Sequence, residues 1–352
     1  MSFTGKNNGA VRHSRAPEGA EERLFLIGLS HVEFLRPREK LALVETLGSA
    51  SRIFELPLAE ISSLVGRRLT TGLWKPDDIL KAASKTDEDL TGGPLGCIFY
   101  WNAAYPTQLR EIYDPPVVLY YRGTLPDDGH PLAAIVGTRF PTGAGSSSAY
   151  RLGFELAREG VGVVSGLARG IDREAHEGCV EAGGYSIAVL GNGVDLIYPV
   201  SSRSAAAALL ARGGAVVSEY PPGTPPLQYH FPARNRIISG LARAVVVVEA
   251  PLRSGALITA EYALEQGRDL YVHAAGLAGT AGAGTRGLAE SGAPVIRGSE
   301  EILRDWGMVP RAAGSRSARK PAEHAGEELA RSLAEEIDGT CALKGGETYW
   351  RG

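Results

Sequence analysis

The middle of this 352-residue chain contains no lysine, so every positive charge there is an arginine. The seven lysines are Lys6, Lys40, Lys75, Lys81, Lys85, Lys320 and Lys344. Because a P-loop requires a lysine, this absence excludes that ATP-binding motif from the central region. Arginine, by contrast, forms forked hydrogen bonds to phosphate and stacks on flat rings. The bias is therefore typical either of a phosphate-binding surface or of a genome rich in G and C.

Cysteine, long apolar runs and net charge are also scarce. Cys97, Cys179 and Cys341 are widely separated and show no metal-binding or redox spacing, so we expect a cytoplasmic protein without a metal site. The first residues lack the apolar stretch of a signal peptide, and no apolar run approaches the roughly 20 residues that span a bilayer, so no membrane insertion is expected. The formal net charge is −3, so any nucleic-acid binding must rest on local charge.

Residues 21–90 are predicted to form a small all-helical domain of the SAM or helix-hairpin kind. Residues 39–47 place apolar side chains on one helical face, and Gly48 ends that helix. Further short helices are expected at 51–65 and 76–83. These short amphipathic segments predict a helical unit that is distinct from the region that follows.

An α/β domain is expected from 95 to 309, after a linker at 87–93. Two short strand-like runs, 96–100 and 117–121, come first. Continuously apolar strands then lie at 132–136, 161–165, 185–190, 215–218, 244–249, 270–273 and 294–296. Helical stretches between them include 144–159, 172–182, 202–212, 234–242 and 256–266. Because buried strands alternate with helices, the pattern predicts a Rossmann-like, doubly wound and mostly parallel sheet.

The two ends of the chain carry little apolar pattern. Residues 1–20 are polar and rich in glycine, and we expect them to be disordered. Residues 310–352 form a tail in which one amphipathic helix fits 322–337, followed by a polar, glycine-rich end. A tail of about forty residues with one helix cannot build a core of its own, so no full winged-helix domain is expected.

In open parallel sheets, ligands bind outside the carboxyl ends of the strands, so the residues that follow each strand carry the functional hypotheses. Arg139 follows the first buried strand, and a glycine- and serine-rich stretch at 143–148 opens the next helix. Free amides at that helix start, with Arg139 beside them, are typical of an anion site. The alternative is a tight turn beside a solvated surface arginine, and the sequence leaves both open.

The second buried strand leads into Ser165 and Gly166, which offer a hydroxyl and a close approach to the backbone. Asp172 is expected to cap the following helix. His176 lies four residues later on the same helical face, which raises the idea of a Ser165–His176–Asp172 triad. We reject this triad because Asp172 and His176 share one helical turn and no nucleophile elbow is present.

Phe231, Arg234, Asn235 and Arg236 stand at the predicted start of a helix, so their side chains and the helix amides would converge on one spot. Such a group suits single-stranded nucleic acid, because the ring stacks on a base and the arginines hold phosphates. The alternative is that Phe231 packs into the core and one arginine makes an internal ion pair. No nucleophile, metal cluster or acid–base pair accompanies the group, which favours binding over catalysis.

A Gly-x-Gly-x-x-Gly pattern occurs at Gly282, Gly284 and Gly287. It lies several residues beyond its strand, and no acidic residue follows at the distance that binds a ribose. We interpret it as a chance match in a glycine-rich loop.

Several ordered motifs resemble the DNA-processing protein A (DprA/Smf) family. They lie at 135–139 (Ile-Val-Gly-Thr-Arg), 165–172 (Ser-Gly-Leu-Ala-Arg-Gly-Ile-Asp), 231–241 and 254–260, with a further match at 105–123. The match covers roughly 95–305 in consistent order. Two stretches depart from the family: 274–276 reads Ala-Ala-Gly where members often have Val-Pro-Gly, and 284–286 ends in arginine where members often have asparagine.

The resemblance implies a cytoplasmic bacterial protein that binds single-stranded DNA, protects incoming DNA and loads the RecA recombinase in natural transformation or related recombination. It also implies a homodimer, and a protein that is not an enzyme, uses no cofactor and hydrolyses no nucleotide. Carried over by motif position, the residues that would line the DNA pocket or stand beside it are Arg139, Ser165, Gly166, Phe231, Arg234, Asn235, Arg236, Arg253, Ser254 and Gly255.

A second hypothesis is a Rossmann-fold, nucleotide-binding enzyme similar to nucleoside monophosphate phosphoribohydrolases. The same edge of the sheet suits phosphate ligands, and the family looks related to the "lysine decarboxylase-like" proteins that cleave nucleotides. Those proteins carry Pro-Gly-Gly-x-Gly-Thr-x-x-Glu, and the nearest stretch here, 282–290, lacks the glutamate at its required place.

Overall fold

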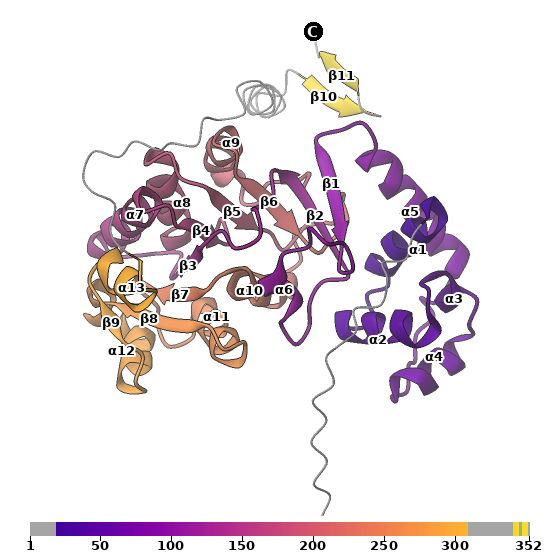
Figure 1. Cartoon of the computed structure of the whole chain (residues 1–352), viewed down its shortest axis with the longest axis horizontal. Helices are drawn as coiled ribbons and strands as arrows, with labels where there is room; N and C mark the ends of the chain where they lie inside the picture. Colours follow the sequence, from indigo (N-terminus) through magenta and orange to yellow (C-terminus); the bar gives the residue numbers. More distant parts are fainter. Residues whose placement is uncertain (1–18, 309–340, 345–346, 351–352) are drawn as a thin grey trace, which may run out of the picture.

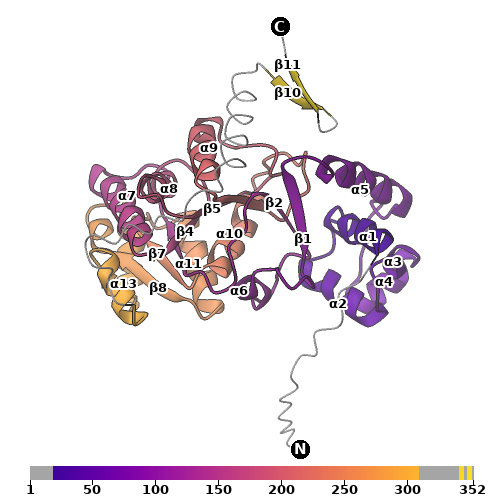
Figure 2. The same cartoon turned by 45° about the horizontal axis from the view of Figure 1, so that its top comes forward.

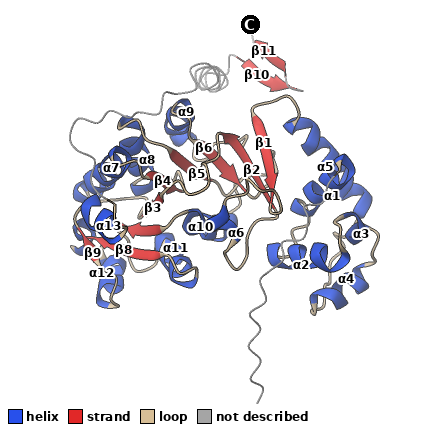
Figure 3. Ribbon diagram, viewed as in Figure 1, coloured by secondary structure: helices blue, strands red, loops and turns tan. Residues whose placement is uncertain are grey.

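A computed structural model describes residues 19–308, 341–344 and 347–350, and its centre is a nine-stranded sheet with helices on both faces (Figures 1 and 3). The strand order is β1-β2-β6-β5-β4-β3-β7-β8-β9. Strands β3 to β9 that neighbour one another are parallel, whereas β1 and β2 add an antiparallel edge next to β6. The predicted Rossmann-like, mostly parallel sheet is confirmed.

The strands coincide closely with the predicted apolar runs. Their bounds are β1 Leu95–Phe99, β2 Val118–Gly123, β3 Leu132–Val136, β4 Gly162–Ser165, β5 Ser186–Val189, β6 Ala215–Ser218, β7 Ala244–Val247, β8 Asp269–His273 and β9 Val295–Ile296. Along the chain, β4, β5 and β6 are added on one side of β3, whereas β7 and then β8 are added on the other. The order of the strands therefore reverses between β3 and β7, which is where open α/β sheets bind ligands.

Helices cover both faces of the sheet, as Figures 1 and 2 show. One face carries α7 (Gly143–Arg158), α8 (Ile171–Glu181), α9 (Arg203–Ala211) and α13 (Ser299–Asp305), and the other carries α6 (Thr107–Arg110), α10 (His230–Leu241), α11 (Gly255–Glu265) and α12 (Ala283–Glu290). Within β3, Ala133 and Ile135 pack on the α7 side and Ala134 and Val136 on the α10 side. Both faces of the strand are buried, which explains its uninterrupted apolar sequence.

The N-terminal helical unit comprises α1 (Ala20–Ser30), α2 (Pro37–Leu47), α3 (Ser51–Phe54), α4 (Leu58–Val65) and α5 (Pro76–Leu90). Gly48 ends α2 in the left-handed conformation, at φ 81°. The helix expected at 51–65 is two helices, because Pro57 lies between them. The helix expected at 76–83 continues to Leu90, so the segment predicted as a linker begins inside α5.

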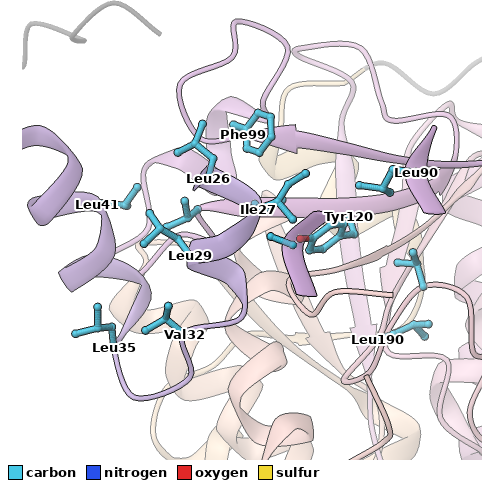
Figure 4. Packing of buried hydrophobic residues seen from close by; sticks show 14 of the residues in the cluster. Leu26, Ile27, Leu29, Val32, Leu35, Leu41, Leu90, Phe99, Tyr120 and Leu190 are labelled. Carbon is cyan, nitrogen blue, oxygen red and sulfur yellow. The ribbon is translucent and has the colours of Figure 1, made fainter. Parts of the chain in front are cut away.

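The helical unit and the sheet share one hydrophobic core. Figure 4 shows Leu26 and Ile27 of α1 close to Phe99 of β1 and Tyr120 of β2, and all four belong to the same buried cluster. The Ser30 hydroxyl also lies 2.7 Å from the Tyr120 hydroxyl. The first strands of the α/β region therefore anchor the helical unit.

Near the C-terminus, β10 (Cys341–Lys344) and β11 (Glu347–Trp350) form an antiparallel hairpin where a polar, glycine-rich end was expected. The helix expected at 322–337 and almost all of the segment 1–20 lie outside the described residues. None of the helices that the structure describes is long and apolar enough to cross a membrane.

Candidate nucleic-acid interface

Arg139 and Phe231 meet at the carboxyl edge of the sheet. Arg139 follows β3 and is exposed, and its guanidinium carbon lies 5.8 Å from the centre of the Phe231 ring. Phe231, in the first turn of α10, is half-buried. A guanidinium over an aromatic face is a cation–π contact. The pair offers a positive charge and a flat apolar surface at one accessible place.

The ring of Phe231 is supported from below and from the side. A Cβ atom at Gly191, in the loop after β5, would lie 3.1 Å from the ring, so glycine leaves the space that the ring needs. On the other side, the Tyr198 ring lies 5.9 Å from the Phe231 ring, tilted by 34°. Tyr198 is 45% exposed. The aromatic surface is therefore wider than one residue.

Tyr198 and Arg169 were not among the sequence-predicted site residues. Arg169, in the loop after β4, is exposed, and its Nε donates to the Ser201 hydroxyl at 3.3 Å. Ser201 lies three residues after Tyr198, so the loops after β3, β4 and β5 are connected through side-chain contacts around Phe231. Both residues follow a parallel strand, and that position was the available signal for them.

Arg234 is buried beneath this surface, with 5% of it exposed. Its guanidinium donates to the carbonyl oxygens of Gly166, at 3.0 Å, and Val189. A Cβ atom at Gly166 would collide with this guanidinium, so the glycine makes room for Arg234 rather than for a ligand. Burial lowers the pKa of Arg234 to about 10; Asp172 opposes that shift, and Arg139 adds to it. Arg139 and Arg234 thus repel each other, and an anion bound beside them would relieve that repulsion.

Ser165 and Asp172 hold the loop after β4 in place. Ser165 is fully buried and its hydroxyl donates to the Ile135 carbonyl at 2.6 Å, so the side chain is turned away from solvent. Asp172 accepts the Gly166 amide at 3.1 Å, where a cap of its own helix was expected. His176 contacts the Ser186 hydroxyl at 2.7 Å. Each of these three side chains thus has a hydrogen-bond partner outside the rejected triad.

The helix start considered as an anion site is already filled by a carboxylate of the chain. Glu249, which follows β7, accepts from the Thr142 amide at 3.0 Å and from the Thr142 hydroxyl at 2.6 Å. Thr142 caps α7, and a Cβ atom at Gly145 would collide with the Glu249 carboxylate. Of the two alternatives for this stretch, the structure supports the tight turn beside an exposed arginine.

The expected convergence of Arg234, Asn235 and Arg236 is wrong, because α10 begins at His230. Consecutive residues inside a helix point about 100° apart. Asn235 accordingly donates to the Gly255 carbonyl at 3.1 Å, on α11. Arg236 points the other way and forms two hydrogen bonds to Glu219, at 2.5 and 2.7 Å. Burial lowers the pKa of Arg236, but Glu219 outweighs it, and the net shift is upward.

The loop at 253–255 joins β7 to α11, next to the loop that carries Arg139. Arg253 is exposed. Ser254 caps α11 by accepting the Ala256 amide at 3.3 Å. Because β3 and β7 are neighbours in the sheet, this loop lies beside the point at which the strand order reverses.

The Gly-x-Gly-x-x-Gly pattern opens α12 rather than lying in a loop, with Gly282 at the helix cap. The amide of Gly284 donates to the Ala250 carbonyl at 2.8 Å, and a Cβ atom there would crowd that backbone. The pattern serves helix-to-strand packing. Across the described part of the chain, no three His, Cys, Asp or Glu side chains gather where they could hold a metal ion.

Comparisons with known proteins agree on one family. A family model described as DNA recombination-mediator protein A matches residues 96–307. The Smf protein of Synechocystis is 46% identical over 210 residues, which are 58% of this chain and 52% of that protein. The DNA processing protein DprA of Streptococcus pneumoniae is 42% identical over 202 residues, 57% of this chain and 71% of that protein. The chain thus spans about half the length of the Smf protein.

Two solved structures share the fold. An X-ray structure of DprA from Streptococcus pneumoniae superposes with a TM-score of 0.66 at 32% identity, covering 82% of this chain and 98% of that one. A structure of DNA processing protein A from Helicobacter pylori, described together with its mode of binding single-stranded DNA, gives a TM-score of 0.53 at 28% identity, covering 61% and 96%. With most of its length matched by the family model, the chain belongs to the family of DNA recombination-mediator protein A, the DprA/Smf proteins.

Proposed function

We propose that this protein binds single-stranded DNA at the carboxyl edge of its sheet, as a binding protein rather than an enzyme. The observation that carries the proposal is the exposed guanidinium of Arg139 set over the Phe231 ring at the reversal point of the strands. Arginine beside an accessible aromatic ring is how sequence-tolerant sites hold phosphates and stack bases. The Helicobacter pylori relative, described as binding single-stranded DNA, supports the proposal.

The site residues divide into two groups by what their side chains contact. Arg139 and Phe231 face solvent, and we assign them, with Arg169, Tyr198 and the exposed Arg253, to direct contact with the strand. The second group holds the surface in shape and consists of Ser165, Gly166, Arg234, Asn235, Arg236, Ser254 and Gly255.

Arg234 stands between these two groups. The hydrogen bonds of Arg234 to two backbone carbonyls hold the ends of two loops together. The positive charge of Arg139 is near enough to contribute to the lowered pKa of Arg234. The long-range field of Arg234 would therefore attract the DNA backbone without direct contact.

A nucleotide-free mobility-shift series with single- and double-stranded oligonucleotides tests the proposal. We expect a preference for single strands, with log affinity falling linearly as log salt rises, by about 0.7 for each phosphate neutralised. Binding that requires ATP, or that is equal for both forms of DNA, would contradict it. Base release from a nucleoside monophosphate, followed in parallel, would favour the phosphoribohydrolase-like alternative.

Membership of the DprA/Smf family supports a wider role. We propose that the protein acts in the cytoplasm as a homodimer, protects incoming strands and loads RecA in natural transformation or related recombination, without hydrolysing nucleotide. RecA filament formation on strands precoated with single-stranded DNA-binding protein, with and without this protein, tests the loading. Sedimentation of the purified chain tests the dimer.

A further inference from the structure

A cavity of about 360 Å³ lies between the helical unit and the α/β unit. Residues 30–40, from the end of α1 into α2, form part of its wall, and residues 219–236, from the end of β6 into α10, form another part. Ala233 and Arg236 line it, whereas Phe231 and Arg234, on other faces of α10, do not. The cavity is therefore separate from the DNA site, and it falls within the roughly 300–1,000 Å³ that is usual for small-molecule sites.

Lys40 lines this cavity without a partner. Only 8% of the residue is exposed. Among the described residues its ammonium group makes no hydrogen bond and no ion pair within 4 Å, although carboxylates lie farther away. Burial lowers the pKa of Lys40 to about 8, against the opposing effect of those carboxylates. A buried cation left in this way is unfavourable, and a bound anion would stabilise it.

The carboxylates that face Lys40 are Glu33, Asp114 and Glu219. Both oxygens of Glu219 accept from Arg236, and one Asp114 oxygen accepts the Arg38 amide at 2.8 Å. These two groups are therefore occupied by other donors. At the rim, the exposed Glu33 opposes an incoming anion and the exposed Arg36 attracts it, so their charges offset each other. Arg236 also lines the cavity and is paired with Glu219, so Lys40 is the buried cation of this lining that has no hydrogen bond among the described residues.

Aromatic side chains form another part of the cavity lining. The Tyr220 and His230 rings stack with their centres 3.7 Å apart, and Tyr229, which is 62% exposed, stands edge-on to His230 at 4.6 Å. Lysine binds phosphate as a compact point charge, and aromatic rings bind bases by stacking. A ligand that carries both a phosphate and a base would use both the lysine and the aromatic part of this lining.

We propose that this cavity binds a phosphate monoester attached to a nucleoside, with Lys40 as the phosphate contact. The source is either a free nucleoside monophosphate or the 5′-terminal phosphate of a DNA strand. The inference stands apart from the DNA-binding proposal, because it concerns the cavity between the units and not the Phe231 surface. An occupant would connect α2 to α10, the helix that carries Phe231.

Two measurements on the full chain test this inference. The first is the midpoint temperature of thermal unfolding, compared between a solution of dAMP and a sodium chloride solution of equal ionic strength. At ten times its Kd, dAMP should raise the midpoint by about 3 °C. The second compares 5′-phosphorylated with 5′-hydroxyl oligonucleotides of one sequence, for which we expect about tenfold tighter binding of the phosphorylated strand if the source is a strand end.

The variant Lys40→Met should abolish whichever response the wild type gives, and Lys81→Met, which changes an exposed lysine of α5, should preserve it. A midpoint response alone identifies a free nucleotide, and a 5′-phosphate response alone identifies a strand end. No response in either wild-type measurement, or a response that survives in Lys40→Met, overturns the inference; if Lys40→Met does not fold, Lys40→Gln takes its place. Binding of the 5′-hydroxyl strand, and its loss in Arg139→Ala, reports separately on the DNA site.

Discussion

The arginines on the two sides of α10 differ in exposure and in pairing. On one side Arg139 is exposed over Phe231, with no carboxylate within ion-pair distance among the described residues. On the other side Arg236 is 6% exposed and has both Glu219 and Asp114 within 4 Å. Both arginines lie in or beside motifs that resemble one DNA-binding family. The comparison teaches that solvent access and a missing carboxylate, not the presence of arginine in a motif, mark a cation that is available to DNA.

The largest expected effect comes from removing the occupied arginine. Arg236→Met leaves Glu219 and Asp114 without their guanidinium partner in a buried place, so the free energy of unfolding should fall by about 3–5 kcal/mol. Urea unfolding measures it. The affinity of the remaining folded protein for a single strand should stay within about threefold of wild type, because this side of α10 does not face the strand.

A matched double variant sharpens this prediction. Arg236→Met with Glu219→Leu removes both charges, so it should recover a good part of the stability lost in the single variant. If Arg236→Met instead keeps its stability and loses DNA affinity, the assignment of Arg236 to the structural side is wrong.

The next effect in size comes from the half-buried ring of Phe231. Phe231→Ala should weaken single-strand binding by about 1–3 kcal/mol, the loss expected for one stacked base. Fluorescence titration of a labelled oligonucleotide measures it. Tyr113 is a matched control, because it is 78% exposed and forms a second cation–π pair outside the proposed site. In that pair the guanidinium carbon of Arg38 lies 4.1 Å from the centre of the Tyr113 ring. Equal losses in Phe231→Ala and Tyr113→Ala would count against a specific stacking position.

The exposed arginine should give a comparable or somewhat smaller effect. Arg139→Ala removes one charge-assisted contact, so we expect a loss of about tenfold in affinity. The unfolding free energy should change by less than about 0.5 kcal/mol, because an exposed side chain is lost. Arg212→Ala is the control: Arg212 is exposed but precedes β6, at the opposite edge of the sheet. Retained affinity in Arg139→Ala would remove the central contact of the proposal.

The sheet could be predicted closely because its signal is local. Strands β3 and β6 have the predicted bounds, since four or five apolar residues between turn residues are typical of a buried strand. The start of α10 could not be predicted in the same way, because Pro232 lies in the first turn of this helix and no Ser, Thr, Asp or Asn side chain caps it. Proline is tolerated in a first turn, so it gave no reliable boundary.

The partners of the site residues were hidden for a different reason. Arg236 meets Glu219 from 17 residues away, and Thr142 meets Glu249 from 107 residues away. These pairs depend on how strands and helices pack, and no spacing in the sequence encodes them. Proximity to a strand end identified Arg139, and an aromatic residue beside arginines identified Phe231, but burial decided that Ser165 and Arg236 point elsewhere. The direction of these side chains could therefore not be predicted from the sequence.

The smallest effect tests how far the exposed side extends. Arg169 is connected to Ser201 and thus to the loop of Tyr198, which places it one loop beyond Arg139 along the carboxyl edge. Because Arg169 stands one loop beyond Arg139, we expect the shortest oligonucleotide held at Phe231 to end before Arg169 and a longer one to reach it. Arg169→Ala should leave the affinity for the shortest binding oligonucleotide unchanged, and should lower the salt dependence for longer strands by about 0.7 in slope, the value of one phosphate contact. A salt slope that is unchanged at every length would confine the available cations to Arg139 and its immediate surroundings, because a strand that passes over the loop after β4 cannot avoid an exposed guanidinium there.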